Sequence, residues 1–376
     1  MIDDQILDDQ ERMLAADPGE MLSAVASSGA QMRESLSAID REVIAKIAAD
    51  GKPRAIIVAG MGGSGVSGDV LTAVAGPSSS IPIVVERTHT LPGWVSPIDL
   101  VVAVSCSGST EETLTVANEA ARRGARLVTI GAAGSQLAAI SEHLSGGHHV
   151  AIDAHGRMPR ASLWTIATPL LMVANALGIA EISDQDFLET ADLMDQLSIE
   201  NGVTVPSIDN VAKTLGMALA ESVPMLWGTG AIGRAVTGRF MAQLAENAKL
   251  PAVHGGLPEV GHNQIVTFDG VLARPLEDED IFRDRVTESL ERRIHLVLMR
   301  DDGEHDSVTK RVQVIKQLVD ARGIAMTELA TRGEHRLARI ASIIVPTDWA
   351  SVYAAIAMGI DPTPIAPIVQ LKAGLH

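Results

Sequence analysis

Two polar groups 16 positions apart could together move protons on a small molecule. Glu246 stands near the end of an expected helix, and His262 stands in the loop segment that follows. A carboxylate and an imidazole are the groups that an aldose–ketose isomerisation requires, one to carry a proton between C1 and C2 and one for hydroxyl or ring-oxygen protons. Taken singly, a solvated helix carboxylate and a loop histidine bonded to backbone are the commoner interpretations. The polar neighbours in "ENAKLPAVHGGLPEVGHN" favour a functional cluster.

A second polar group precedes another expected helix, in "SCSGSTEETL". It consists of Ser105, Ser107, Ser109 and Thr110. Free backbone N–H groups, the positive end of a helix dipole and several hydroxyls around one point form a cup suited to a monophosphate. The alternative is that these residues only cap the helix. The spacing predicts a phosphate site at this turn.

A glycine-rich turn, "GMGGSG", follows a short apolar strand. Gly60, Gly62 and Gly65 fit the dinucleotide pattern G-x-G-x-x-G, and Glu86 stands near the position of a ribose-binding acid. An NAD-linked oxidoreductase therefore stays open as an alternative. A single glycine fingerprint is weak, however, and no hydride-transfer site accompanies it.

Strands alternate with helices along most of the chain, which indicates parallel sheets with right-handed crossovers. The strand, glycine-rich turn and helix beginning at Arg54 recur from Val223, so two copies of one α/β unit are expected. In the second copy the turn equivalent to the hydroxyl-rich one carries Arg300, Asp301, Asp302 and Glu304. Carboxylates repel phosphate, so we expect the anion in the first copy. Loops gathered at one sheet edge would bring the distant Glu246 and His262 towards it.

The fold class predicted is α/β, with two doubly wound parallel-sheet Rossmann-like lobes joined by helices. The expected plan is an N-terminal helical segment (1–40), a first lobe with the phosphate site (41–155), a helical connector (156–205), a second lobe (206–348) and C-terminal helices that contribute to the active site (349–376). The charged run Asp278–Arg285 is expected to be a solvated face.

Composition narrows the function classes. The 376 residues carry a formal net charge of −17 and only 2% aromatic side chains, which disfavours nucleic-acid and anionic-membrane partners. The single cysteine, Cys106, excludes an intrachain disulfide. With no signal-peptide pattern and no long uninterrupted apolar run, we expect a cytoplasmic protein. The scattered histidines show no metal-ligand spacing, so neither a metal nor a cofactor is expected.

Six motifs in one order resemble a known family, the bifunctional phosphoglucose/phosphomannose isomerases built from two SIS (sugar isomerase) domains. They are "GMGGSGVSGD", "SCSGSTEETL", "MPRASL", "ENAKLPA", "LPEVGHNQIV" and "GIDPTPIAPIVQLK", and the resemblance covers about Ile56 to Leu375. It implies interconversion of glucose 6-phosphate or mannose 6-phosphate with fructose 6-phosphate through an enediolate.

The resemblance also implies roles for residues that match the family motifs. Gly62, Gly63 and Ser64 would lie beside the sugar, and the hydroxyl-rich turn would hold the phosphate. Arg160 would stabilise the enediolate, Glu246 would be the base, and Lys372 would reach the substrate. His262 would open the sugar ring from the partner subunit, which implies a homodimer.

Some positions depart from the family pattern. They are Cys106 in place of an aromatic residue, Ser109 in place of asparagine, and Gly261 and Gln264 in place of asparagine and glutamate. These departures leave a second interpretation open, in which the chain is a catalytically weak SIS-domain regulator or scaffold that binds a sugar phosphate.

Overall fold

The computed structural model describes residues 2–3, 5–273 and 292–374. The chain divides into two compact units, each described here by itself. The first unit comprises Ser27–Asp195 and Gly333–Ala341, and the second comprises Met1–Ala26, Gln196–Arg332 and Ser342–His376. The predicted charged face at Asp278–Arg285 lies outside the described residues.

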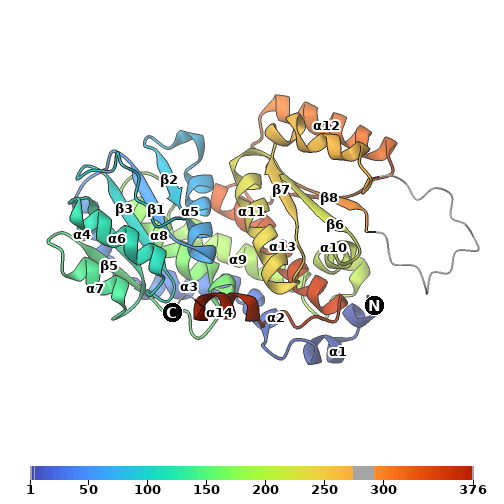
Figure 1. The fold of residues 1–376 in the computed structure, drawn as a ribbon, viewed down its shortest axis with the longest axis horizontal. Helices are drawn as coiled ribbons and strands as arrows, with labels where there is room; N and C mark the ends of the chain where they lie inside the picture. Colours follow the sequence, from blue (N-terminus) through green and yellow to red (C-terminus); the bar gives the residue numbers. More distant parts are fainter. Residues whose placement is uncertain (1, 4, 274–291, 375–376) are drawn as a thin grey trace, which may run out of the picture. The chain divides into compact units, whose positions relative to one another are not determined.

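A five-stranded parallel sheet, ordered β2-β1-β3-β4-β5, forms the centre of the first unit (Figure 1). Its strands are β1 (Ile56–Ala59), β2 (Ile83–Glu86), β3 (Leu100–Ser105), β4 (Arg126–Ala132) and β5 (His148–Ile152). The continuous apolar runs of β1 and β3 are buried along their whole length, as expected for parallel strands covered on both faces. The predicted parallel α/β fold is confirmed.

Helices cover both faces of this sheet. The helices of the unit are α3 (Ser28–Ala38), which packs on α8, together with α4 (Arg41–Ala49), α5 (Gly62–Ala75), α6 (Glu111–Arg122), α7 (Gln136–Glu142), α8 (Leu163–Ala176) and most of α9 (Asp184–Glu200). The α6 and α7 helices pack together on one face, while α5 and α8 pack together on the other. Buried apolar residues of β1, β3 and α6 form a continuous core beneath the α6 face.

The strand order fixes where a ligand can sit. In a sheet of order 2-1-3-4-5, the chain moves from β1 to one side and then crosses to the other side for β3, and ligands bind outside the carboxyl ends of the two strands that flank this switch point. Here those strands are β1 and β3, whose registers pair Ala59 with Ala103. The glycine-rich turn after β1 and the hydroxyl-rich turn after β3 therefore emerge side by side at this point.

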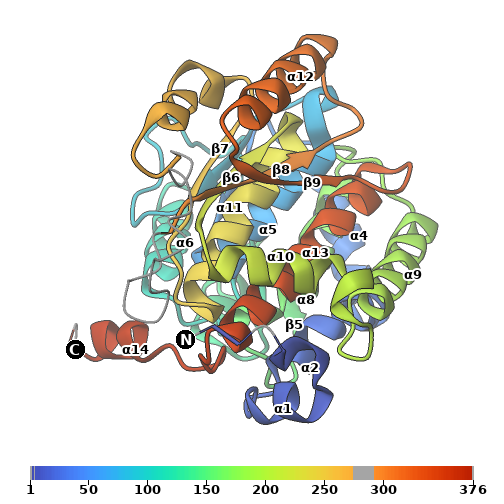
Figure 2. The same cartoon turned by 90° about the vertical axis from the view of Figure 1, so that its right-hand side faces the viewer.

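The second unit repeats this order in a four-stranded parallel sheet, β7-β6-β8-β9. Its strands are β6 (Val223–Gly228), β7 (Val253–Gly256), β8 (Ile294–Arg300) and β9 (Ala325–Ala330). One face carries α12 (Asp306–Ala321), and the other carries α10 (Val211–Ala220), α11 (Gly230–Asn247) and part of α13 (Arg336–Ala357) (Figures 1 and 2). Matching strand orders support the internal repeat.

The shorter elements complete the description. They are α1 (Gln10–Ala15), α2 (Met21–Ala26), α14 (Ala366–Ala373) and the 3-10 helices η1 (Ile6–Asp8), η2 (Gly76–Ser78), η3 (Pro159–Ala161), η4 (Ser207–Asp209), η5 (Glu259–His262) and η6 (Gln264–Asp269).

The C-terminal helical region begins earlier than the sequence predicted. Two helices were expected from Trp349 onward, whereas α13 begins at Arg336 and continues through Pro346. By length and composition α13 could cross a membrane, with a mean hydropathy of 1.4, yet that apolar stretch is wholly buried inside the protein. Its apolar character is that of a core helix, which tolerates proline because packing stabilises the helix on either side.

Acidification should destabilise the protein through His295, which is 7% exposed in β8 and shares a 2.8 Å hydrogen bond with Thr327. Burial lowers the pKa of this imidazole from its ordinary value of 6.5. Below that pH the His295 imidazole binds a proton in the unfolded chain but stays neutral in the folded chain, so the free energy of unfolding falls as the pH drops. We expect a loss of up to about 1.4 kcal/mol per pH unit from this group.

Urea unfolding at pH 7.5, 6.5 and 5.5 measures this slope. His295→Gln should flatten it, whereas His89→Gln, at an exposed position of the first unit, should not. Equal slopes for His295→Gln and the unmodified protein would contradict the prediction.

Candidate active site

The glycine-rich turn presents bare backbone at the carboxyl end of β1. Gly62 opens α5 with a φ of +52°, and a Cβ at this position would meet nothing within 4 Å. A Cβ on Gly63 would come within 2.8 Å of the Pro159 carbonyl oxygen. Met61, at the N-cap position, makes no side-chain cap hydrogen bond. A ligand can therefore approach the helix start closely.

Arg160 lies next to this turn. It belongs to η3, is only 4% exposed, and its Cα lies 3.8 Å from the position of a Cβ on Gly63. Its Nη1 contacts the Met158 Sδ at 2.9 Å. The first unit thus brings together the predicted sugar-binding glycine and the predicted enediolate-stabilising arginine, which are almost a hundred positions apart in sequence.

The four hydroxyls of the second turn are organised in two pairs. Ser105 Oγ lies 2.9 Å from Thr110 Oγ1 and accepts a hydrogen bond from the Gly108 N–H at 3.1 Å. Ser107 Oγ lies 3.0 Å from Ser109 Oγ. Ser105 is buried, while Ser107 and Ser109 are exposed. A ligand can therefore reach the second pair of hydroxyls directly, and the first pair stabilises the turn from inside. The left-handed Gly108, with a φ of +66°, packs so closely on Ser135 that no side chain fits.

Helix capping does not account for these hydroxyls. Thr110 occupies the N-cap position of α6, but its side chain makes no cap hydrogen bond and pairs with Ser105 instead. The first N–H groups of α6 are thus left without a side-chain cap from Thr110, which favours an anion at this point. Glu111 and Glu112 in the first turn of α6 oppose that attraction.

Cys106 stands inside the hydroxyl-rich turn. Burial raises the pKa of its thiol, and the nearby Arg157 offsets only part of that rise. The thiol therefore stays neutral at physiological pH and adds no negative charge beside a bound phosphate.

In the second unit the equivalent turn, after β8, holds charged side chains that pair with one another. Arg300 bonds to Glu304 and, at 3.3 Å, to Glu328. Burial raises the pKa of Glu304, but hydrogen bonds from Arg300, Thr229 and Thr309 outweigh it and hold that pKa below its ordinary value. An ionised carboxylate at this switch point disfavours phosphate, which supports the assignment of the anion to the first unit.

Glu246 lies half-buried near the end of α11. The neighbouring helix face is fixed to α13: Arg239 makes a buried two-point ion pair with Asp348 at 2.9 and 2.6 Å, and Asn247 donates to Ser351 at 2.9 Å. Successive helical residues are rotated by roughly 100°, so Glu246 is turned away from the face that Asn247 anchors. Sequence reasoning missed this anchor, although Arg239, Gln243 and Asn247 repeat every four residues.

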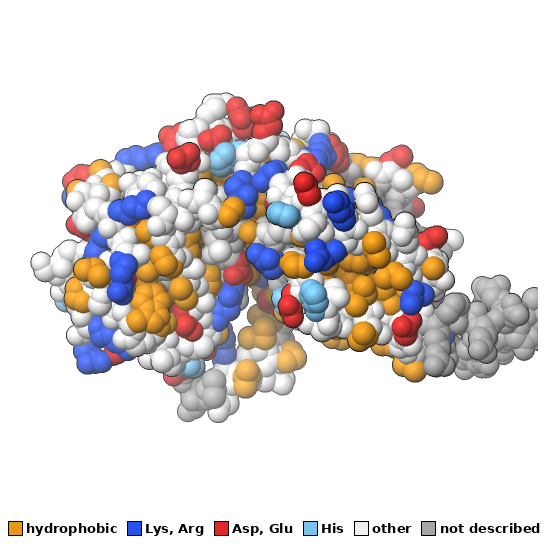
Figure 3. Space-filling view, turned by 90° about the horizontal axis from the view of Figure 1, so that it is seen from above, with side chains coloured by type: hydrophobic (Ala, Val, Ile, Leu, Met, Phe, Trp, Pro, Cys, Tyr) orange, Lys and Arg blue, Asp and Glu red, His pale blue; other side chains and the backbone are white. Residues whose placement is uncertain are grey.

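His262 ends η5, just after β7. It is exposed and borders a cavity of about 410 Å³ whose other lining residues come from the same segment and from α12: Leu257, Gly261, Ile265, Ser307, Lys310, Arg311, Val314 and Ile315. The same elements expose Val266 (71%) and Val314 (53%). Figure 3 shows apolar side chains gathered on the face seen from above, on the side where Figure 1 places α12.

Glu246 stands near the C-terminal end of α11, whereas His262 stands at the end of η5, beyond the carboxyl end of β7. The Leu257 N–H donates to the Gly228 carbonyl at 2.8 Å, which holds the histidine segment beside the start of α11. Glu246 stands 16 residues after Gly230, a helical rise of about 24 Å. A crossover helix carries its last residues back towards the other edge of the sheet, so α11 leads Glu246 away from the strand ends that precede the His262 segment.

Two further predicted positions have clear surroundings. Lys372 lies exposed on α14, a helix with no buried residue. Gln264, one of the departures from the family pattern, accepts from Trp227 Nε1 at 2.8 Å and donates to the His254 carbonyl at 3.1 Å. A glutamate could not make the second bond, so this glutamine fixes η6 against the sheet.

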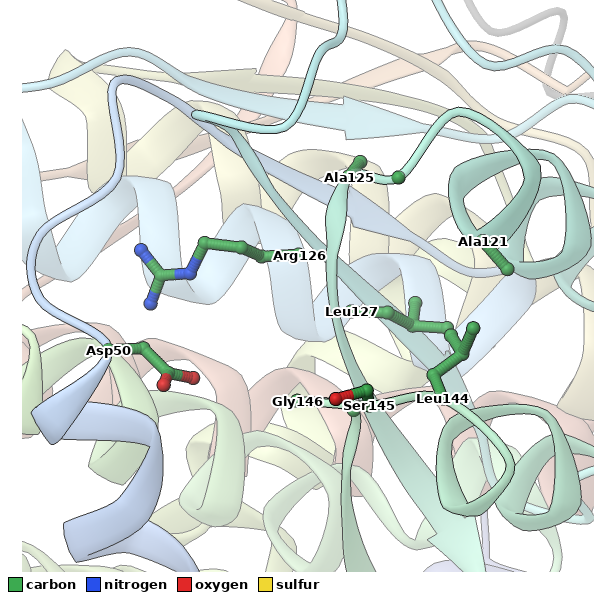
Figure 4. Close-up of a pocket in the computed structure, with 10 residues that line it drawn as sticks. Asp50, Ala121, Ala125, Arg126, Leu127, Leu144, Ser145 and Gly146 are labelled. Atoms are coloured by element: carbon green, nitrogen blue, oxygen red, sulfur yellow. The ribbon is translucent and has the colours of Figure 1, made fainter.

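The opposite edge of the first unit's sheet also holds a cavity, of about 310 Å³ (Figure 4). It lies at the amino end of β4, where Arg126 donates to the Gly51 carbonyl at 2.8 Å, with Asp50 and Ser145 on its walls. None of the predicted site residues lines it. Within the described ranges no group of three or more His, Cys, Asp or Glu residues could hold a metal ion.

These features define a protein built from two SIS domains. Residues 52–180 match the SIS domain family, and residues 208–375 match the bacterial phospho-glucose isomerase C-terminal SIS domain. The chain belongs to the bifunctional phosphoglucose/phosphomannose isomerase family. It is 30% identical to that isomerase from Caldicellulosiruptor bescii, over 84% of this chain and 88% of the relative. It is 29% identical to that from Aquifex aeolicus, over 86% and 90%.

Solved structures share the fold at lower sequence identity. The C-terminal domain of glucosamine-fructose-6-phosphate aminotransferase from Francisella tularensis aligns with a TM-score of 0.64 and 14% identity, covering 92% of this chain and 98% of that one. The fold is thus shared with these structures, while the relatives from Caldicellulosiruptor bescii and Aquifex aeolicus confirm the family resemblance and the predicted enzyme class, a sugar-phosphate isomerase.

Proposed function

We propose that this protein interconverts glucose 6-phosphate, mannose 6-phosphate or both with fructose 6-phosphate in the cytoplasm. One observation carries the proposal. In a chain of this isomerase family, the glycine-rich turn after β1 and the hydroxyl-rich turn after β3 lie together at the switch point of the sheet, beside Arg160. The turn at Ser105–Thr110 would hold the phosphate, and Gly62, Gly63 and Ser64 would face the sugar. The chemistry needs no metal or cofactor.

The proposed mechanism passes through an enediolate. Glu246 would remove the proton from C2 of the aldose and return it to C1, and Arg160 would stabilise the negative oxygen that develops between these steps. Both epimers give the same enediolate, which accounts for action on glucose and mannose phosphates. Lys372, on the exposed α14, would contact the substrate.

The proposed enzyme is a homodimer in which His262 serves the partner's site. Two observations support this arrangement: the length of α11 that separates Glu246 from His262, and the exposed apolar side chains on the elements that border the His262 cavity. A second copy of the chain covering this surface would remove apolar area from water and carry the imidazole to a glutamate of the other subunit.

A coupled assay with glucose 6-phosphate and with mannose 6-phosphate tests the proposal. Turnover of at least one sugar supports it. Stabilisation by sugar phosphate in a thermal-shift measurement, with turnover of neither sugar, would instead establish a binding protein of the regulator or scaffold type.

The phosphate assignment makes a separate prediction for Ser107, the exposed hydroxyl paired with Ser109 at 3.0 Å. A hydrogen bond to a charged group contributes enough that Ser107→Ala should raise KM for the sugar phosphate and Ki for inorganic phosphate by about tenfold, with kcat little changed. Ser145→Ala, at the opposite edge of the same sheet, is the matched control. Unaltered KM and Ki in Ser107→Ala would place the phosphate elsewhere.

A further inference from the structure

Lys249 follows the end of α11 in an unusual backbone conformation. Its φ is +54°, in the left-handed region, where a side chain is disfavoured and glycine is the common residue after a helix. The Leu250 N–H bonds back to the Leu244 carbonyl at 3.1 Å, one residue further back than the usual closing bond, which the Ala125 N–H makes to the Ala120 carbonyl beyond the left-handed Gly124. A lysine at this position therefore calls for a function of its side chain.

The ammonium group of Lys249 joins two segments of the second unit. It lies 2.9 Å from the Glu246 carbonyl oxygen and 3.1 Å from that of Asn247, at the end of α11 where carbonyls lack helical partners. It also lies 3.2 Å from the carbonyl oxygens of Asp361 and Pro362. These two residues form the turn that leads into α14.

The rest of both segments is held by other contacts. The body of α11 is anchored to α13 by the buried Arg239–Asp348 pair. The turn is closed by a 2.9 Å bond from the Thr363 N–H to the Asp361 side chain, and Thr363 packs so closely on Gly19 that no Cβ fits there. Lys249 itself is exposed, so its loss should leave the fold intact and alter only the spacing between the helix end and the turn.

We propose that Lys249 is a positioning residue for the isomerase reaction, holding the helix end that bears Glu246 and the turn that leads to Lys372 at one fixed separation. The inference rests on the proposed function, in which these two side chains meet the substrate. Lys249 touches backbone carbonyls and acts through Glu246, so it is no catalytic residue in this scheme.

A purely structural role for Lys249 predicts the opposite behaviour. If the residue only ended the helix, glycine would replace it with no loss, because glycine suits a φ of +54°. Lys249→Met keeps the side-chain stem and removes the ammonium, while Lys249→Arg keeps a cation with several donors. Lys46→Met, which removes the exposed ammonium paired with Glu42 at 2.8 Å on α4, is the matched control.

The kinetic test measures kcat, KM and melting temperature of the full chain carrying each variant. We expect Lys249→Gly and Lys249→Met to stay folded with KM near normal and with kcat reduced about tenfold to a hundredfold, since small misplacements of a reacting group cost this much. Lys249→Arg should recover most of kcat, and Lys46→Met should keep all of it. A normal kcat in Lys249→Gly would overturn the proposal.

Amide hydrogen exchange without substrate separates this inference from the proposed function. Peptides covering 247–250 and 361–365 should exchange faster in Lys249→Met than in the unmodified protein. Unchanged exchange would overturn the proposal that Lys249 holds these two segments together. If the unmodified protein fails to isomerise either sugar, the proposed function falls, while the exchange result still decides whether Lys249 joins the two segments.

Discussion

Replacing Glu246 with glutamine should reduce kcat for isomerisation by about a thousandfold, in the range that a general base contributes. The amide is nearly the same size as the carboxylate but cannot accept the C2 proton. The side chain is half-buried at the end of a helix whose body is anchored by Arg239 and Asp348, so the substitution should leave the fold unchanged.

Isotope incorporation gives this prediction a second measurement. In deuterated water the unmodified enzyme should place deuterium on the carbon that receives the returned proton, because a carboxylic acid exchanges with solvent while the enediolate is bound. Glu246→Gln should turn over and incorporate deuterium about a thousandfold more slowly, yet inorganic phosphate should still bind at the Ser105–Thr110 turn. The surface variant Glu221→Gln should behave as the unmodified protein. Turnover of Glu246→Gln within tenfold of normal would exclude Glu246 as the base.

The sequence contained most of the information that positions the turn proposed to bind phosphate. Each short apolar run followed by glycine or serine is a local pattern, so β1 and β3 and the turns after them could be predicted from adjacent residues alone. Their meeting at a switch point also follows from the alternation of strands and helices, because only a parallel sheet accommodates it. The contact between Gly63 and Arg160 could not be predicted this way, since it depends on how η3 packs on α5.

Other features were hidden because tertiary contacts decide them. The pairing of Ser105 with Thr110, instead of a cap on α6, depends on the fixed geometry of Gly108 against Ser135. The strand β7 (Val253–Gly256) ends in two glycines and lies at a sheet edge, so it has no apolar run to reveal it.

The separation of Glu246 from His262 bears directly on how the active site is completed. Proximity in sequence suggested one cluster, but α11 displaces Glu246 by about 24 Å from the end of the sheet layer that holds His262. If both groups act on one substrate, the simplest arrangement takes each from a different copy of the chain. Inactive variants of the two residues should then rescue each other.

Mixing Glu246→Gln with His262→Ala subunits should restore activity that neither variant has alone. In a mixed dimer one site pairs both defects, and the other pairs an intact glutamate with an intact histidine. Random exchange of subunits makes about half of all dimers mixed, so the mixture should reach about a quarter of the normal rate. Mild unfolding and refolding of the two proteins together, followed by the fructose 6-phosphate assay, measures this recovery.

The same experiment carries its own controls, because the two possible arrangements predict different outcomes. If His262 served the Glu246 of its own chain, every site in a mixed dimer would hold one defect and activity would stay at the level of the separate variants. Refolding each variant alone controls for recovery caused by the procedure, and sizing chromatography reports whether dimers form. A mixture of Glu246→Gln with Arg160→Ala subunits is a further control, because it tests whether rescue is specific to His262. If Glu246 and Arg160 of one chain serve the same site, every site in a mixed dimer carries one of the two defects, and no activity is recovered.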